Sequence, residues 1–138
     1  MSISSTVLDL STVAGTQIVL IDDEQGVLRA LTLVLEGFGC IVAPYTNSED
    51  AVSKILKTEG LTDLVVSDFR MPKMSGLDVV SALRACGSLV PFILMSGHAT
   101  TEDIEDAKNA GATAFIAKPF SPIQLIEQIV LLKMKKAA

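Results

Sequence analysis

The sequence predicts an α/β domain built on a doubly wound parallel β-sheet, and two observations indicate it. Short, mostly continuous apolar runs alternate five times with helix-length amphipathic segments. Runs that are apolar throughout are typical of parallel strands covered on both faces. A regular alternation of strands and helices gives a parallel sheet with right-handed crossovers. We therefore expect one sheet with helices packed on both of its faces.

The expected strands and helices follow in order along the chain. The strands cover residues 18–21, 40–43, 64–67, 92–95 and 114–117. The first helix carries apolar residues at helical spacing and stops at the glycines of residues 37–39. The second follows Asn47 and stops at Gly60. The third opens at Ser75 with Asp78 three residues later, which is a capping-box pattern.

The last two helices carry equally clear signals at their ends. The fourth opens near Thr100 with acids in its first turn, where the helix dipole favours them, and it ends at Gly111. The fifth has Ser121 as its N-cap and Pro122 at the first helical position. These signals predict five separate helices joined to the strands by short loops.

The fifth helix presents two apolar faces. One face should cover the sheet at about 100° per residue, and it comprises Ile123, Ile126, Val130 and Met134. Nearly opposite lies a second stripe, where a simple surface helix would be polar, and it comprises Leu125, Ile129 and Leu132. We predict that this second stripe, together with the fourth helix and the fifth strand, forms a docking or homodimer surface.

Composition and charge exclude several classes of protein. The 138 residues fit one compact domain, and a hydrophobic share of 49% supports a sizeable core. A net charge of −5 opposes direct binding of nucleic acid. The apolar stretches are too short to span a membrane, and the N-terminal extension of residues 1–16 lacks the pattern of a signal peptide. We expect a cytoplasmic protein in which Cys40 and Cys86 are buried or half-buried thiols.

Chemically active residues follow the expected strands directly. Asp22 and Asp23 follow the first strand, Asp68 follows the third, Ser96 the fourth and Lys118 the fifth. The carboxyl ends of parallel strands lie at one edge of the sheet, so these side chains should meet. Three carboxylates in one place raise one another's pKa values. A hard divalent cation such as Mg²⁺ removes that cost with oxygen ligands.

This arrangement predicts a metal site and a nucleophile together. Asp23 and Asp68 suit direct Mg²⁺ ligation, Asp22 suits ligation through water, and the backbone carbonyl of Arg70 completes the set. The Asp68 carboxylate can also attack phosphorus to form an acyl phosphate. Lys118 then supplies a positive charge to the phosphoryl oxygens. A hydroxyl donor is available from Ser96.

Four stretches of the sequence resemble the response-regulator receiver family of two-component signalling. They are VLIDDE at 19–24, VVSDFRMPKMSGLDVV at 65–80, ILMSGHA at 93–99 and AFIAKPF at 114–120. The resemblance covers about residues 17 to 135 and assigns 17–136 to a receiver domain. It implies a flavodoxin-like five-stranded sheet of order 2-1-3-4-5. The implied phosphodonor is a histidine kinase or a histidine phosphotransfer protein.

The resemblance also implies a role for individual residues. Asp68 becomes the phosphoacceptor and Lys118 the phosphoryl-binding lysine, while Asp22 and Asp23 become the metal acids. Ser96 becomes the switching hydroxyl. A cis peptide bond is implied before Pro119.

Three further residues occupy positions with a possible regulatory meaning. Phe115 stands where the family places its switch aromatic, and it lacks the hydroxyl that a Tyr would carry. Arg70 lies two residues after Asp68, and His98 lies two residues after Ser96. We expect both to face the mouth of the site, where a cation would tune the lifetime of the phosphoryl group.

Two other classes of protein compete with this interpretation. A haloacid dehalogenase phosphatase needs two acids two residues apart after the first strand, whereas Asp22 and Asp23 are adjacent. A flavin-binding domain needs a phosphate loop there, and the acids of residues 22–24 would repel phosphate. A complete single-domain regulator and a receiver taken from a longer DNA-binding regulator or hybrid histidine kinase both stay open.

Overall fold

The computed structural model describes residues 8–58 and 60–137, and its centre is a five-stranded sheet of order β2-β1-β3-β4-β5. The strands are β1 (Gln17–Ile21), β2 (Ile41–Tyr45), β3 (Leu64–Asp68), β4 (Phe92–Ser96) and β5 (Ala114–Ala117). Each neighbouring pair is parallel. The predicted doubly wound α/β fold and its strand order are thereby confirmed.

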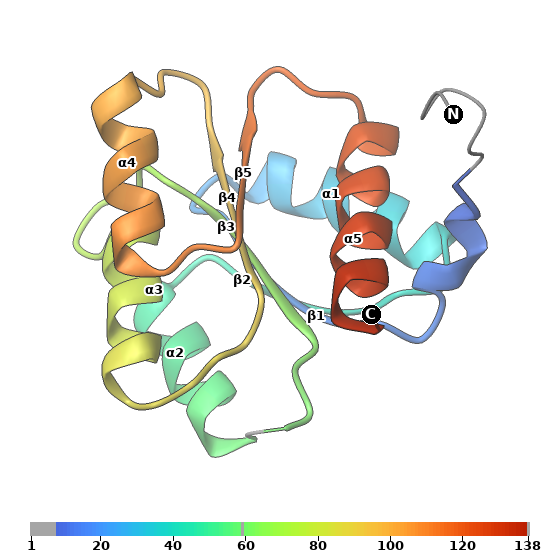
Figure 1. Cartoon of the computed structure of the whole chain (residues 1–138), viewed down its shortest axis with the longest axis horizontal. Helices are drawn as coiled ribbons and strands as arrows, with labels where there is room; N and C mark the ends of the chain where they lie inside the picture. The colour runs from blue at the N-terminus through green and yellow to red at the C-terminus, as the bar shows by residue number, and fades with distance from the viewer. Residues whose placement is uncertain (1–7, 59, 138) are drawn as a thin grey trace.

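Five α-helices cover the two faces of this sheet (Figure 1). They are α1 (Gln25–Gly37), α2 (Ser48–Lys57), α3 (Gly76–Ala85), α4 (Thr101–Ala110) and α5 (Pro122–Ala137). Helices α1 and α5 lie on one face, and α2, α3 and α4 lie on the other. Alternate strand residues point to opposite faces, so the core divides into two buried clusters, one on each side of the sheet.

The helices begin where the cap signals predict. Ser75 and Thr100 each form a capping box with the acid three residues later, Asp78 and Asp103 respectively. The Asn47 side chain accepts a hydrogen bond from the N–H of Asp50 at the start of α2. These caps satisfy N–H groups that a helix cannot bond internally. They also fix where the loops at the carboxyl edge of the sheet end.

The predicted orientation of α5 is correct for Ile126 and Val130, which are buried, and wrong for the other residues of its two predicted faces. Leu125 and Ile129, expected on an outer stripe, are each only 1% exposed, and Leu132 is half-buried. Ile123, expected to cover the sheet, is instead 42% exposed, and Met134 is also exposed. The stripe of Leu125, Ile129 and Leu132 therefore provides no docking surface.

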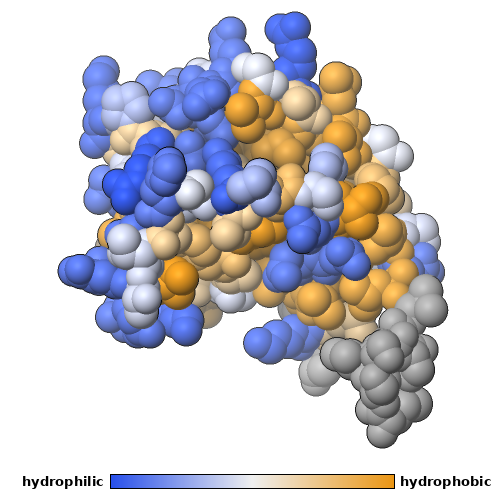
Figure 2. Space-filling model, turned by 90° about the horizontal axis from the view of Figure 1, so that it is seen from above, coloured by the Kyte–Doolittle hydropathy of each residue, from blue (hydrophilic) through white to orange (hydrophobic). Residues whose placement is uncertain are grey.

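The reason is that α5 turns a single wide face toward the core. Its buried residues are Leu125, Ile126, Ile129 and Val130. At about 100° per residue these four form one contiguous arc, whose centre lies between the two predicted stripes. Apolar residues gather over the half of the molecule that carries α1 and α5, whereas hydrophilic residues dominate over α2, α3 and α4 (Figure 2). Within the described residues, no helix is long and apolar enough to cross a membrane.

Of the two cysteines, only one lies where composition suggests. Cys40 is buried just before β2, and its thiol lies 3.6 Å from the carbonyl oxygen of Val13. Cys86 is exposed, contrary to expectation, because it is the C-cap residue of α3 and follows the last turn that packs on the sheet.

The segment before β1 packs against the core cluster on the side of the sheet that carries α1 and α5. A short 3₁₀ helix, η2 (Leu10–Val13), contacts α5, and Val13 is fully buried. The Lys133 ammonium group of α5 donates to the carbonyl oxygen of Thr12 (2.8 Å) and to the hydroxyl of Thr16 (3.0 Å). Residues 8–16 are thus tied to the C-terminal half of α5.

Replacing Val13 with Ala should lower the free energy of unfolding by about 2 kcal/mol, because two buried methyl groups are lost and a cavity remains. Leu33→Ala is the matched control, since Leu33 is 64% exposed on α1 and its loss should change stability little. Urea unfolding of both variants measures the difference. Equal stability of the two variants would show that the segment before β1 adds nothing to the folded unit.

Candidate functional site

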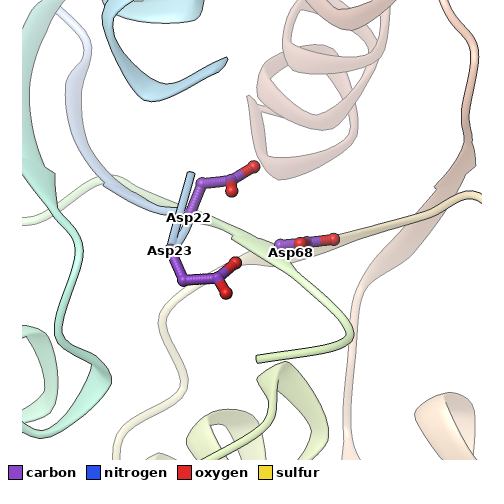
Figure 3. Close-up of side chains that lie close together, drawn as sticks. All are labelled: Asp22, Asp23 and Asp68. Atoms are coloured by element: carbon purple, nitrogen blue, oxygen red, sulfur yellow. The ribbon is translucent and has the colours of Figure 1, made fainter. Parts of the chain in front are cut away.

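Three aspartates meet at the carboxyl edge of the sheet (Figure 3). Asp22 and Asp23 come from the segment that follows β1, and Asp68 is the last residue of β3. One carboxylate oxygen from each lies within 4.8 Å of the others. The structure therefore brings together the acids that the sequence singles out.

Asp22 is the buried member of this cluster, with only 1% of its side chain exposed. Its Oδ1 accepts a hydrogen bond from the backbone N–H of Glu24 (2.9 Å). Its Oδ2 is buried and has no hydrogen-bond partner among the described residues. Burial raises the pKa of Asp22, and the charges of Asp68 and Asp23 add to the effect, against the Glu24 N–H and Lys118.

Lys118 joins the cluster from the end of β5. Its Nζ lies 3.3 Å from Asp68 Oδ1 and 3.6 Å from Asp22 Oδ2. The Lys118–Pro119 peptide bond is cis. The backbone N–H of Phe69 also donates to Asp68 Oδ1 (3.0 Å). Within the described residues the polar contacts of the Asp68 carboxylate all use Oδ1, which leaves Oδ2 available to a ligand.

Ser96 lies between the strands that carry Asp68 and Lys118. Met95 is opposite Asp68 in the β3–β4 register, and Ser96 is the next residue. The Ser96 carbonyl accepts a hydrogen bond from the Lys118 N–H (2.7 Å). Its buried hydroxyl oxygen accepts one from the N–H of His98 (3.4 Å). Within the described part of the chain the Ser96 hydroxyl proton has no acceptor, so the hydroxyl can donate to a ligand.

The cluster fits a divalent cation by the chemistry of its donors. Among the residues that the structure describes, three carboxylates face a single ammonium group, that of Lys118, and one buried carboxylate oxygen lacks a hydrogen-bond donor. A hard divalent ion such as Mg²⁺ takes oxygen ligands and keeps several waters, which suits one buried and two more accessible acids. Asp22, Asp23 and Asp68 would hold it.

Two residues that the sequence reasoning missed shape the position of Asp68. Phe69 supplies the N–H that orients Oδ1, and its carbonyl accepts a hydrogen bond from the N–H of Gly76 (2.9 Å). Gly76 is buried at the first position of α3, where a Cβ would overlap the carbonyl oxygen of Asp68 and the Leu94 side chain. A glycine directly after an N-cap serine is a signal that could have indicated this close approach.

Gly76→Ala should destabilise the protein by about 1–3 kcal/mol, because the added methyl forces α3 away from the end of β3. Gly37→Ala is the matched control, because an added Cβ there would meet nothing within 4 Å apart from its chain neighbours and the backbone of its own helix. The Gly37 variant should be as stable as the parent or more stable by up to about 1 kcal/mol. Thermal unfolding compares the two. A Gly76→Ala protein as stable as the parent would contradict the packing argument.

The structure also places three other residues that the sequence singles out. Phe115 is half-buried, with its ring centroid 6.3 Å from that of Phe69. Arg70 turns toward α4, where it pairs with Asp103 (3.3 Å) and lies over the Phe69 ring. His98 is exposed in the loop after β4. The structure gives Arg70 a specific partner, which the sequence did not suggest.

Comparison with known proteins agrees with the fold and identifies the family of the chain. A family model for the response regulator receiver domain matches residues 18–130. The DNA-binding response regulator MtrA of Mycobacterium leprae is 32% identical over 113 residues, which cover 82% of this chain and 49% of MtrA. A 14.6 kDa protein of Leptolyngbya boryana is 32% identical over 122 residues, which cover 87% of this chain and 92% of that protein.

Solved structures show a similar fold. The chemotaxis protein CheY4 of Vibrio cholerae superimposes with a TM-score of 0.78 at 25% identity, covering 84% of this chain and 97% of CheY4. The chain spans about half the length of the DNA-binding response regulators that it matches. The similarity to MtrA therefore concerns one part of that protein.

Proposed function

The chain belongs to the response regulator receiver domain family, and from this premise we propose that it accepts a phosphoryl group on Asp68 in a Mg²⁺-dependent reaction. The observation that carries the proposal is the contact of Lys118 Nζ with Asp68 Oδ1 beside two further carboxylates. A cation against a nucleophilic carboxylate, at the open edge of a parallel sheet, is the arrangement that phosphoryl transfer requires.

In the proposed reaction an oxygen of Asp68 forms a bond to phosphorus. The bond from phosphorus to the donor's imidazole nitrogen breaks, and that nitrogen keeps the electron pair and takes up a proton. Oδ2 is the favoured nucleophile, because Oδ1 already accepts from Phe69 and Lys118. Lys118 then moves from the carboxylate to a phosphoryl oxygen, which carries more negative charge. The Ser96 hydroxyl donates to another oxygen.

Mg²⁺, when bound by Asp22, Asp23, Asp68 and the Arg70 carbonyl, would neutralise the acids and one phosphoryl oxygen. The residues themselves exclude water from one side of the nucleophile, since Asp22 and Ser96 are buried. The protein acts as a signalling domain. Its catalysis is restricted to its own phosphorylation and dephosphorylation.

The proposed switch joins Ser96 to Phe115. When the Ser96 hydroxyl turns toward the phosphoryl group it releases the His98 N–H, and the half-buried Phe115 ring can move into the vacated space. Phe115 already contacts Phe69, the neighbour of the phosphoacceptor. Because Phe115 has no hydroxyl, a partner detects the change only through altered side-chain packing on the surface of α4 and β5.

The proposed phosphodonor is a histidine kinase or a histidine phosphotransfer protein. The supporting relatives include DNA-binding response regulators, in which a receiver occupies about half of the protein. The function as a relay or stand-alone regulator, and the function as the receiver of a longer DNA-binding protein, share the chemistry at Asp68. The two functions differ in the partner that binds the surface of α4 and β5.

Acetyl phosphate with Mg²⁺ tests the proposal directly. The protein should gain one phosphoryl mass by intact mass spectrometry, and the modification should survive acid and be lost in base, as an acyl phosphate is. A chelator added beforehand should prevent it. Absence of labelling under any Mg²⁺ concentration would refute the proposed function.

A further inference from the structure

The carboxylate of Asp103 makes two separate contacts in the structure. Its Oδ2 accepts a hydrogen bond from the N–H of Thr100 (3.1 Å), which closes the capping box of α4. The same oxygen lies 3.3 Å from Nη2 of Arg70, in the loop that follows β3. The first turn of α4 lies at the carboxyl edge of the sheet (Figure 1), and the aspartate cluster follows the ends of β1 and β3 at that edge. One carboxylate therefore connects the loop after the phosphoacceptor to the start of a helix.

The Arg70 side chain lies along a path of contacts that begins at Asp68. The Phe69 N–H donates to Asp68 Oδ1, and the Phe69 ring contacts Phe115. The Arg70 guanidinium carbon lies 5.6 Å from the centroid of that same ring. Arg70 thus covers Phe69 on one side while its end is held by Asp103.

The pair is weak enough to exchange partners. Arg70 is 61% exposed and Asp103 21% exposed, so water screens their attraction. The single contact between them uses one nitrogen, although a guanidinium prefers two parallel hydrogen bonds to one anion. A phosphoryl group on Asp68, two residues away in the chain, offers three oxygens and a larger charge. It is therefore a stronger acceptor than the Asp103 carboxylate, which Thr100 already shares.

We propose that Asp103 is a positioning residue that holds Arg70 against α4 and competes with a phosphoryl group on Asp68 for its guanidinium. The inference rests on the proposed function of Asp68. Phosphorylation draws Arg70 away from Asp103 and loosens the first turn of α4. By linkage, the factor by which phosphorylation weakens the Arg70–Asp103 pair is also the factor by which breaking that pair favours the phosphorylated state.

The test is the affinity for beryllofluoride, a phosphoryl mimic, in the presence of Mg²⁺. Asp103→Asn keeps an oxygen that accepts from Thr100 but loses the charge that holds Arg70. Its affinity should rise about threefold, a factor set by the strength of exposed ion pairs. Asp106→Asn removes the same charge from an exposed position one turn further along α4, and its affinity should equal that of the parent.

A double-variant cycle separates competition from a general effect of charge. Arg70→Gln should weaken the binding of beryllofluoride. Adding Asp103→Asn to that variant should leave the affinity unchanged, because the guanidinium for which Asp103 and the mimic compete is absent. An Asp103→Asn affinity equal to the parent's, or an increase that persists in the Arg70→Gln protein, would overturn the inference while leaving the proposed function intact. Failure of the parent itself to bind beryllofluoride would instead refute the proposed function and the inference with it.

Amide exchange gives a second readout. In the parent, beryllofluoride should accelerate exchange at the first amides of α4, since Asp103 is released. In Arg70→Gln the mimic should accelerate exchange at these amides less than in the parent, because only the change through Ser96 and Phe115 remains. Protection that increases in the parent on adding beryllofluoride would contradict the proposed release.

Discussion

The Asp68→Asn protein should take up no phosphoryl group from acetyl phosphate, while the parent becomes labelled to near completion. The amide keeps the size of the carboxylate and still accepts from the Phe69 N–H and Lys118, so the local geometry is preserved. It loses the negatively charged oxygen that attacks phosphorus. The difference should therefore be a loss of chemistry with little change in structure.

The stability of Asp68→Asn gives an independent check of its folding. Asp68 is one of three clustered acids, so removing its charge relieves repulsion with Asp22 and Asp23. Without Mg²⁺ the variant should melt at the same temperature as the parent or at a higher one. Asp106→Asn, an exposed acid on α4, serves as the charge-matched control and should be labelled normally. A fully labelled, folded Asp68→Asn protein would move the phosphoacceptor to another residue.

The helix ends and the location of the site follow from signals that are local in the sequence. Serine, threonine and asparagine caps begin α2, α3 and α4 as their patterns predict. Apolar runs identify the strands, although β2 begins at Ile41 and continues through Pro44 to Tyr45, two residues beyond the predicted end at residue 43. Pro44 is tolerated because β2 is an edge strand. Once the strands are parallel, their carboxyl ends must converge, which brings Asp22, Asp68 and Lys118 together.

The contacts that local patterns do not encode join residues far apart in the chain. Arg70 and Asp103 are separated by 33 positions, and each alone resembles an ordinary surface charge. The rotation of α5 about its axis depends on what it packs against, and η2 adds Val13 to that face. Leu125 and Ile129 are therefore buried, although the periodicity of α5 also allowed an outward stripe. Tertiary packing decides between apolar faces of similar size.

The second large effect concerns Asp22. Burial raises the pKa of Asp22 in the folded protein above that of the unfolded chain, where an Asp has a pKa of about 3.9. The folded state then binds this proton more tightly than the unfolded state does. Without metal, the contribution of Asp22 to stability is most favourable below the unfolded pKa, and it declines as the pH rises through the folded pKa. As the pH rises, ionisation of the buried Asp22 therefore opposes folding of the metal-free protein.

Asp22→Asn should remove this cost and weaken the metal site at the same time. The amide oxygen still accepts from the Glu24 N–H, and Lys118 keeps Asp68 as its partner, so the metal-free variant should be more stable than the parent at pH 7. Its Mg²⁺ affinity should fall by about 10-fold to 100-fold, the range for losing a supporting metal-site residue.

Urea unfolding from pH 3.5 to 7, with chelator and with Mg²⁺, measures both effects. The parent should gain more stability from Mg²⁺ than the variant does, and the two metal-free curves should diverge as the pH rises. Curves that stay parallel across this range would mean that Asp22 is not held at a raised pKa in the folded protein. Unchanged Mg²⁺ affinity would remove Asp22 from the metal site.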